Sequence, residues 1–246
     1  FHDAAQAPAG MIGYSKGFAL ANVDSVDVVV AGVGGHGAYP HTTKDPIVIA
    51  ANIVTRLQTL ISRERDPLEP AVITVGSFQA GSKHNIIPDE ARLQITVRSY
   101  KDETRQQLLE GIARIAKGEA LAAGMPEDKL PRVTVQDPYT PATYNTPEFT
   151  DKVMSGLKTR FEGRVFEVPS VMGGEDFSQF YRADRENVES LIFWVGGVRA
   201  GEWDKSQKGE ITLPSLHSPF WAPDAPVVIA TATEAMTAAT LDLMKK

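Results

Sequence analysis

The chain has 246 residues, 42% of them apolar, so it can bury one sizeable core or two modest ones. Its 31 acidic residues outnumber its 25 basic ones for a net charge of -6, and no dense Lys/Arg cluster occurs, which argues against a nucleic-acid partner. No apolar run approaches the roughly 18 residues of a membrane span, and the absence of cysteine excludes disulfides, thiolate metal sites and cysteine nucleophiles. We therefore expect a soluble protein without a membrane partner, in the cytoplasm or the periplasm.

The first part of the chain, Phe1-His2-Asp3 onward, shows neither an initiator Met nor a targeting pattern, which predicts a chain cut from a longer one. Beyond it, Val26, Val28 and Val30 alternate with Asp27 and Val29 and predict a strand. Asp45-Pro46 supplies an N-cap and a first-turn proline for a helix. The expected elements are a strand at 25–32, a helix at 45–63, strands at 71–80 and 90–100, a helix at 102–123 and a strand at 132–137.

This order, βαββαβ, is that of a ferredoxin-like domain, with two helices on one face of a four-stranded antiparallel sheet. The C-terminal part predicts a helix at 147–162, an apolar strand at 191–195 and a helix at 224–244. Helices alternating with apolar strands indicate part of a parallel-type α/β sheet covered on both faces, whose first strands precede the chain. The expected domains are 1–23, an inserted domain at 24–138, and 139–246.

The histidines lie in connecting segments, where functional groups concentrate. His36 lies in the string Gly34-Gly35-His36-Gly37-Ala38-Tyr39-Pro40-His41, in which glycines allow close approach of backbone and ligand. A solvated loop histidine is the commoner interpretation of any one of them, and for His41 and His84 a role in anchoring a turn is at least as well supported.

A second string, His84-Asn85-Ile86-Ile87-Pro88-Asp89, precedes a strand that ends at Arg98. We expect the amide of Asn85 and the guanidinium of Arg98 to lie close together. An arginine fork matches the plane of a substrate carboxylate, although a surface ion pair is the alternative role for Arg98.

The two strings, in this order on a split βαβ domain, resemble the lid of M20 amidohydrolases and aminoacylases. Two later strings, Met172-Gly173-Gly174-Glu175-Asp176-Phe177 and Leu216-His217-Ser218-Pro219, resemble motifs of the hippurate hydrolase and auxin-conjugate hydrolase branch. Phe1-His2 resembles the end of a strand that carries a metal-ligand histidine. The resemblance covers essentially the whole chain, and it implies a lid or dimerisation domain inserted in the C-terminal half of a catalytic domain.

The resemblance also implies roles for individual residues. His2 and His217 would bind divalent metal, with two ions of Zn, Mn, Co or Ni in the complete enzyme. His36 would reach into the active site of a partner subunit and hold the oxyanion of the tetrahedral intermediate. The implied contacts with substrate come from Asn85, Arg98, Gly173, Gly174 and Glu175, the last with a steadying role beside the metal as an alternative.

The family mechanism also needs a glutamate that transfers the proton, and no string that would supply it or further metal ligands occurs in this chain. The resemblance therefore implies a parent enzyme that hydrolyses the amide bond of N-acyl amino acids or similar small conjugates. The chain alone is expected to be inactive and to form a homodimer through the lid. Two alternatives are a non-catalytic dimerisation or regulatory module, and an unrelated α/β ligand-binding protein.

Overall fold

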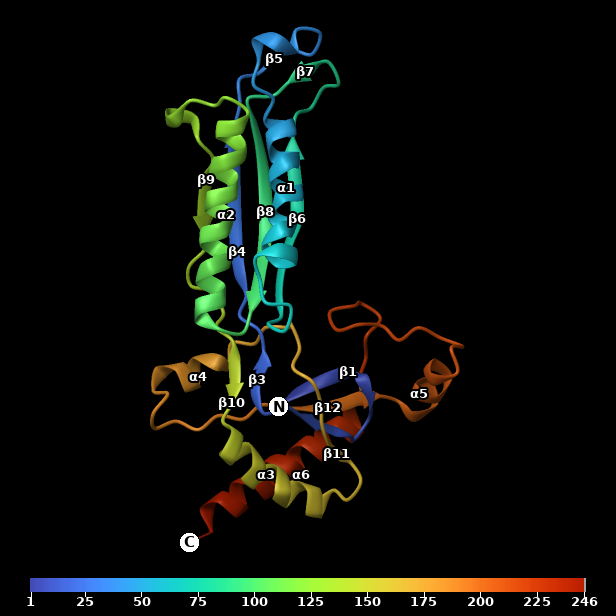
Figure 1. The fold of residues 1–246 in the computed structure, drawn as a ribbon. Helices are drawn as coiled ribbons and strands as arrows, with labels where there is room; N and C mark the ends of the chain where they lie inside the picture. The colour runs from blue at the N-terminus through green and yellow to red at the C-terminus, as the bar shows by residue number, and fades with distance from the viewer. Residues whose placement is uncertain (246) are drawn as a thin grey trace. The chain divides into compact units, whose positions relative to one another are not determined.

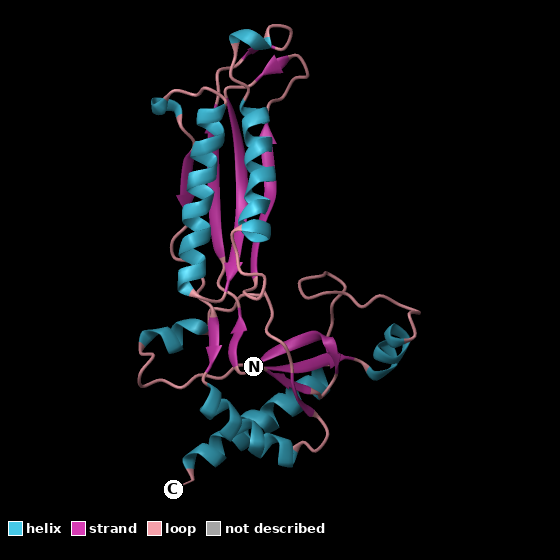
Figure 2. Cartoon of the chain, in the orientation of Figure 1, coloured by secondary structure: helices cyan, strands magenta, loops and turns pink. Residues whose placement is uncertain are grey.

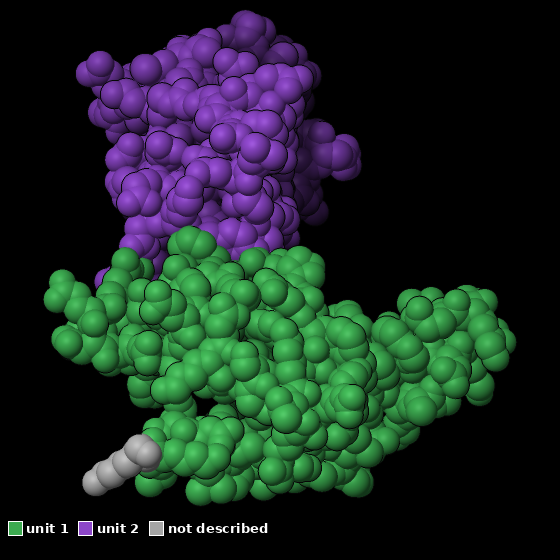
Figure 3. Space-filling view, turned by 60° about the horizontal axis from the view of Figure 1, so that its bottom comes forward, with its two compact units in different colours: residues 1–19, 143–171, 177–246 green, residues 20–142, 172–176 purple. Residues whose placement is uncertain are grey.

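The structure, a computed structural model, describes residues 1–245 and divides into two compact units (Figure 3). Unit 1 consists of Phe1–Ala19, Thr143–Val171 and Phe177–Lys246, and unit 2 consists of Leu20–Ala142 and Met172–Asp176. The divisions lie a few residues outside the expected boundaries at 24 and 138. No sequence pattern indicated that Met172–Asp176 would join unit 2.

Unit 2 is built on one antiparallel sheet with strand order β6-β8-β4-β9 (Figure 1). Two helices pack together against one face of this sheet, and a small strand pair lies beyond the start of the first helix. The elements are β4 (Asp24–Ala31), β5 (Gly35–His36), α1 (Pro46–Arg63), β6 (Ala71–Ala80), β7 (Ile86–Ile87), β8 (Glu90–Ser99), α2 (Asp102–Ala122) and β9 (Arg132–Val135), with short 3-10 turns at Pro40–Thr42 and Glu127–Lys129.

The core of unit 2 follows from the periodicity of these elements. Val26, Val28 and Val30 of β4 are at most 1% exposed, and they pack with the apolar faces of α1 and α2. The side chain of Asp45 caps α1 by accepting a hydrogen bond from Ile47 N at 2.8 Å. The expected ferredoxin-like arrangement is therefore confirmed, and the α/β class of the chain with it.

Unit 1 contains a four-stranded sheet of order β1-β12-β2-β11, formed by β1 (His2–Pro8), β12 (Phe193–Val198), β2 (Ile12–Tyr14) and β11 (Val165–Glu167). The pairs β1–β12 and β2–β11 are parallel, but β12 and β2 are antiparallel. The expectation of a parallel sheet is wrong in this respect. The antiparallel pairing was not predicted because β2 has only three residues, too few to show a period of their own.

Helices α3 (Pro147–Arg160) and α6 (Ala225–Met244) pack against the sheet of unit 1 through Ile12, Tyr14, Phe193 and Val195 (Figure 2). The opposite face bears an apolar groove of about 210 Å³, lined by residues that include Trp194. The remaining elements, β3 (Gly17–Leu20), β10 (Thr143–Asn145), α4 (Ser178–Ala183) and α5 (Ala200–Gln207), were not expected from the sequence.

Among the described residues, α6 alone is long and apolar enough to cross a membrane, which corrects the expectation that no segment is. This is weak support for a membrane span, because the core helix of a soluble protein passes the same test. Val228, Ala232 and Ala235 of α6 are buried in the core of unit 1.

Candidate functional site

The structure brings two of the motif strings together at one end of unit 2, which we call the tip and which consists of residues 33–45 and 81–89, with β5 and β7. His36 in β5 pairs with Ile86 in β7, and Gly37 N donates a hydrogen bond of 2.8 Å to Asn85 O. His36 and Asn85, far apart in the sequence, are thus neighbours. The two strings are thus joined through their backbones, a contact that the sequence did not predict.

Glycines make this close pairing possible. A Cβ on Gly34 would lie 2.7 Å from Ile87 O, and one on Gly37 would lie 3.1 Å from Asn85 O. Gly34 N also donates to Asp89 Oδ1 at 3.0 Å. The glycines of the first string therefore allow its backbone to lie close to the backbone of residues 85–87.

The imidazole of His36 is oriented by its own loop. Its Nδ1 lies 3.0 Å from Ala38 N, which can only donate, so Nδ1 acts as the acceptor. In the neutral ring the proton is then on Nε2, which becomes a hydrogen-bond donor. The side chain is exposed, and the ring of Tyr39 lies 5.4 Å away, centroid to centroid.

The other end of unit 2, which we call the base, consists of residues 20–24, 98–105, 137–142 and 172–176. Here Arg98 Nη1 donates to Met172 O at 2.9 Å, and Ala21 N donates to Gly173 O at 2.8 Å. A Cβ on Gly174 would lie 2.2 Å from Val23 Cγ2. The Gly173-Gly174 motif therefore packs against Ala21 and Val23 within the base.

The expectation that Asn85 and Arg98 lie close together is wrong. Asn85 precedes β7 at the tip, whereas Arg98 is the last residue but one of β8 at the base (Figure 1). The strand from Glu90 to Arg98 alone spans about 27 Å at the usual rise of an antiparallel strand. The long regular strand, which the sequence did predict, is the reason for the separation.

The first of the two proposed metal ligands, His2, begins β1 in unit 1. Its Nδ1 lies 2.7 Å from the carbonyl oxygen of Asp3, which can only accept, so Nδ1 carries the proton. The lone pair of Nε2 is then the one available to a metal, and a backbone carbonyl on the other nitrogen is the usual support of a ligating histidine.

His217 lies in an exposed turn of unit 1, with a positive φ of 65°. A non-glycine residue in this region is strained and is commonly found at functional sites. The turn is tied to β1, because Trp221 Nε1 donates to Asp3 Oδ2 at 2.9 Å. Asp3 therefore contacts His2 and the segment that follows His217.

Within residues 1–245 no group of three or more His, Asp or Glu side chains could hold a metal ion. His2 and His217 are imidazole donors suited to divalent transition metals, but together they are an incomplete set. The sequence analysis missed Asp3 and Trp221 as supports of this pair. The only signals were their positions next to His2 and four residues after His217.

Sequence reasoning also missed a buried polar network at the base. Asp24 is fully buried and accepts from Arg105 Nη2 at 2.7 Å and from Asn22 Nδ2 at 2.7 Å, and Arg105 stacks on Tyr139 at 3.6 Å. Asn22 Oδ1 in turn accepts from the amide and the hydroxyl of Ser99. The network joins the two chain segments that enter and leave unit 2.

Known proteins match this chain both within unit 2 and over most of its length. A family model described as the peptidase dimerisation domain matches residues 18–123, which fall almost wholly within unit 2. The chain is 36% identical over 195 residues to N-acetyldiaminopimelate deacetylase of Bacillus subtilis, a match that covers 79% of this chain and 50% of that protein. It is 35% identical over 196 residues to thermostable carboxypeptidase 2 of Saccharolobus solfataricus, covering 79% of this chain and 47% of that protein.

Among solved structures, a dinuclear metal-binding peptidase of the M20 family from Bacillus subtilis superposes with a TM-score of 0.69 and 25% identity. This match covers 99% of the chain and 56% of that structure. The chain thus spans about half the length of the curated relatives it matches.

Proposed function

Because the chain belongs to the M20 family of metallopeptidases and amidohydrolases, we propose that its protein hydrolyses the amide bond of N-acyl amino acids or similar small conjugates. The products are a carboxylic acid and a free amino acid. The observation that carries the proposal is His36, whose neutral ring is held with Nε2 as a donor by Ala38 N.

The proposed role of His36 is to stabilise the oxyanion that forms when the scissile carbonyl is attacked. A neutral imidazole donates one hydrogen bond and needs no proton transfer to do so, and its tautomer is fixed before substrate binds. A preorganised donor of this kind contributes about 3 to 4 kcal/mol to transition-state stabilisation. Asn85, beside His36 at the tip, is proposed to contact the amide or carboxylate of the substrate.

His2 and His217 are proposed to hold divalent metal, of which the complete enzyme would bind two ions. Zn, Mn, Co and Ni all accept imidazole ligands. When bound, such ions polarise a carbonyl and lower the pKa of water. The contact of His2 Nδ1 with Asp3 O orients Nε2 for this purpose. The remaining ligands and the carboxylate that moves the proton are proposed to come from other parts of the enzyme.

The separation of tip and base supports a homodimer. His36 and Asn85 lie at the tip, whereas Gly173, Gly174 and Glu175, the proposed pocket residues, lie at the base of the same unit. One small substrate cannot contact both ends when β8 alone spans about 27 Å. The tip of one protomer is therefore proposed to serve the site at which the partner contributes its base.

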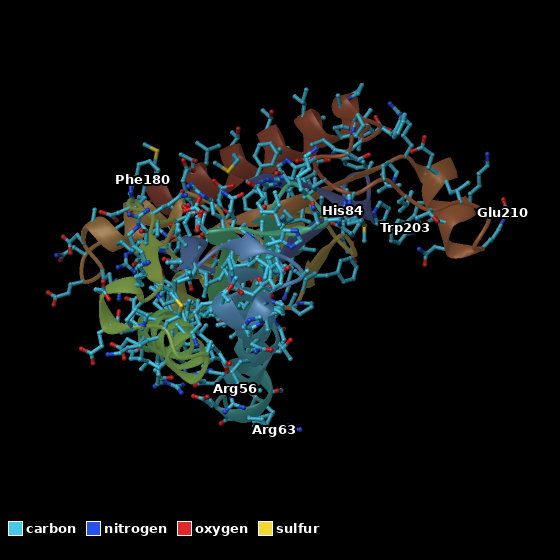
Figure 4. The ribbon with its side chains drawn as sticks, turned by 90° about the horizontal axis from the view of Figure 1, so that it is seen from above. Arg56, Arg63, His84, Phe180, Trp203 and Glu210 are labelled. Carbon is cyan, nitrogen blue, oxygen red and sulfur yellow. The ribbon has the colours of Figure 1, made fainter. Side chains whose placement is uncertain are left out.

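The edge of unit 2 formed by β6 and α1 is the proposed dimer surface. β6 is an edge strand with one side unpaired in the sheet. On α1 the exposed residues Val48, Ala51 and Thr55 are small and uncharged, and the Thr55 hydroxyl donates to Ala51 O of its own helix. Arg56 and Arg63 are exposed on the outer side of α1 (Figure 4).

The test is hydrolysis of a panel of N-acyl amino acids by the purified protein, with metal analysis on the same sample. His36→Ala should lower kcat about 100- to 1000-fold with little change in KM or stability. His41→Ala, a histidine in the same loop without the Ala38 contact, is the matched control. Equal activity of His36→Ala and the wild type would contradict the oxyanion role.

A non-catalytic dimerisation or regulatory module is the second candidate. It is favoured by one observation, that the described residues hold no three-ligand metal group. It predicts a stable dimer that neither binds metal nor hydrolyses any member of the panel. Size-exclusion chromatography with light scattering, beside the activity assay, separates the two candidates.

A further inference from the structure

We infer that Tyr39 is a positioning residue for His36, whose imidazole is restricted in orientation by the ring of Tyr39 and the side chain of Ile86. The restriction itself rests on contacts at the tip of unit 2. Its consequence for catalysis rests on the proposed function, because a donor to the oxyanion gains from being held in one orientation before the substrate binds.

The ring of Tyr39 is the first of these neighbours. The centroids of the His36 and Tyr39 rings are 5.4 Å apart, and the ring planes are tilted by 54°. This separation lies within the range in which aromatic rings attract one another. Tyr39 is 58% exposed, so its ring belongs to no hydrophobic core. The tip therefore places an exposed aromatic ring against the histidine.

The backbone on both sides of Tyr39 is fixed. Tyr39 N donates to His36 O at 2.8 Å, which closes a four-residue turn between the two rings. Tyr39 O accepts from Thr42 N at 3.1 Å and from Thr42 Oγ1 at 2.9 Å. Pro40 further limits the backbone conformation of the residue before it. These contacts hold the Cα of Tyr39 beside His36, so its ring stays close to the imidazole.

The second neighbour, Ile86, pairs with His36 across β5 and β7. The hydrogen bond from Gly37 N to Asn85 O joins the residues next to this pair, which makes it a non-hydrogen-bonded pair. Side chains lie closest in pairs of this kind. Ile86 is 54% exposed, and its β-branched side chain has few rotamers. The imidazole therefore has a stiff apolar neighbour in addition to the ring of Tyr39.

The hydrogen bond from Ala38 N to His36 Nδ1 selects the tautomer but does not by itself fix the ring. The bond is exposed, so water competes for both of its partners. Rotation about the last side-chain torsion, which is broad in histidine, also breaks it. Apolar neighbours oppose this rotation without offering a competing hydrogen bond. Tyr39 and Ile86 therefore preserve the orientation that Ala38 selects, with Nε2 as the donor.

Nitrogen NMR of the histidine rings tests the restriction on the purified protein. At about pH 8, where an imidazole is neutral, a fixed tautomer gives widely separated Nδ1 and Nε2 shifts, whereas exchange between tautomers averages them. In Tyr39→Ala the two shifts of His36 should move toward each other, and Tyr39→Phe, which keeps the ring, should retain the wild-type values. Wild-type shifts in Tyr39→Ala would overturn the inference.

His41→Ala is the matched control for this measurement. The ring of His41 lies 6.3 Å from that of Tyr39, and its removal leaves Tyr39 beside His36. The nitrogen shifts of His36 should therefore stay at their wild-type values. Because Tyr39 is exposed, Tyr39→Ala should fold normally, and an unchanged amide spectrum of unit 2 outside the tip verifies this.

Kinetics of the complete enzyme test whether Tyr39 acts through His36. Tyr39→Ala should lower kcat about 2- to 10-fold with KM unchanged, since the oxyanion forms only after the carbonyl is attacked. Tyr39→Phe should keep most of the activity. In the His36→Ala background, Tyr39→Ala should have no further effect on kcat. An equal loss in both backgrounds, or a change confined to KM, would mean that Tyr39 contacts the substrate itself and would overturn the inference.

Failure of the proposed function gives a different result. An enzyme that hydrolyses no N-acyl amino acid of the panel contradicts the proposed function. The nitrogen shifts of His36 in Tyr39→Ala and Tyr39→Phe then decide alone whether Tyr39 positions the ring.

Discussion

The tip and the base of unit 2 are built by different means. At the tip, two short strands are held by backbone hydrogen bonds between a glycine-rich segment and residues 85–87, and His36 is exposed. At the base, Asp24 is fully buried and forms a two-pronged ion pair with Arg105. The difference indicates that the base stabilises the unit and that the tip presents the His36 side chain to solvent. Variants at each end should therefore affect different measurements.

The largest effect on stability is expected at the base. Asp24→Ala leaves Arg105, whose side chain is only 19% exposed, without its carboxylate, and also removes the acceptor of Asn22 Nδ2. Removing one partner of a buried ion pair costs about 3 to 5 kcal/mol of unfolding free energy. Urea unfolding monitored by circular dichroism measures the loss. Glu90→Gln, in an exposed pair with Arg92, is the control and should change stability by no more than about 1 kcal/mol.

A smaller and local effect is expected at the tip. Gly34→Ala places a Cβ 2.7 Å from Ile87 O and 2.8 Å from Asp89 Oδ1, and overpacking of this kind costs about 1 to 3 kcal/mol. The strain should open the pairing of β5 with β7, so amide exchange at Gly37 should increase while the core of unit 2 stays protected. Gly118→Ala, at a glycine of α2 with no atom within 4 Å of the added Cβ, is the control. Increased exchange throughout the sheet of unit 2 would contradict a local effect.

Capping of α1 contributes less again. Asp45→Ala removes the acceptor of Ile47 N and should cost about 1 kcal/mol. The comparison with Asp45→Asn, which keeps an acceptor oxygen, isolates the hydrogen bond. If thermal unfolding shows the same loss for both variants, the carboxylate charge rather than the cap is responsible.

Long elements, short elements and the contacts between distant residues differ in how far the sequence predicted them. Most long elements of unit 2 begin and end within one residue of the expected limits, because β4, β6 and β8 have 8 to 10 residues and show alternation or apolar runs. The motif strings identified His36 and Asn85, but only the pairing of β5 with β7 showed that they are neighbours. β2, β10 and β11 have three residues each, too few to reveal a period. The hydrogen bond from Arg98 to Met172 O joins residues that no local sequence pattern connects.

The smallest effect concerns pH and a partly exposed cluster of charged side chains near the start of α2. Hydrogen bonds from Lys101 and Arg65 lower the pKa of Glu69 below its ordinary value. A carboxylate whose pKa is lower in the folded state stabilises the protein above the unfolded pKa, and this contribution is lost as the pH falls through the folded pKa. Glu69→Gln should therefore have a lower unfolding free energy than the wild type at neutral pH. This difference should shrink below about pH 4, where the carboxylate of the wild type becomes protonated.

Urea titrations at several pH values measure this difference. Lys101→Met in the Glu69→Gln background should change little further, because Glu69 is the hydrogen-bond partner of Lys101. A difference between Glu69→Gln and wild type that stays constant from neutral pH to pH 3 would mean that packing of the side chain, and not its charge, is what Glu69 contributes. In that case the charge of Glu69 would not contribute to stability. The buried ion pair of Asp24 and Arg105, whose charges are shielded from solvent, would remain as the electrostatic contribution at the base.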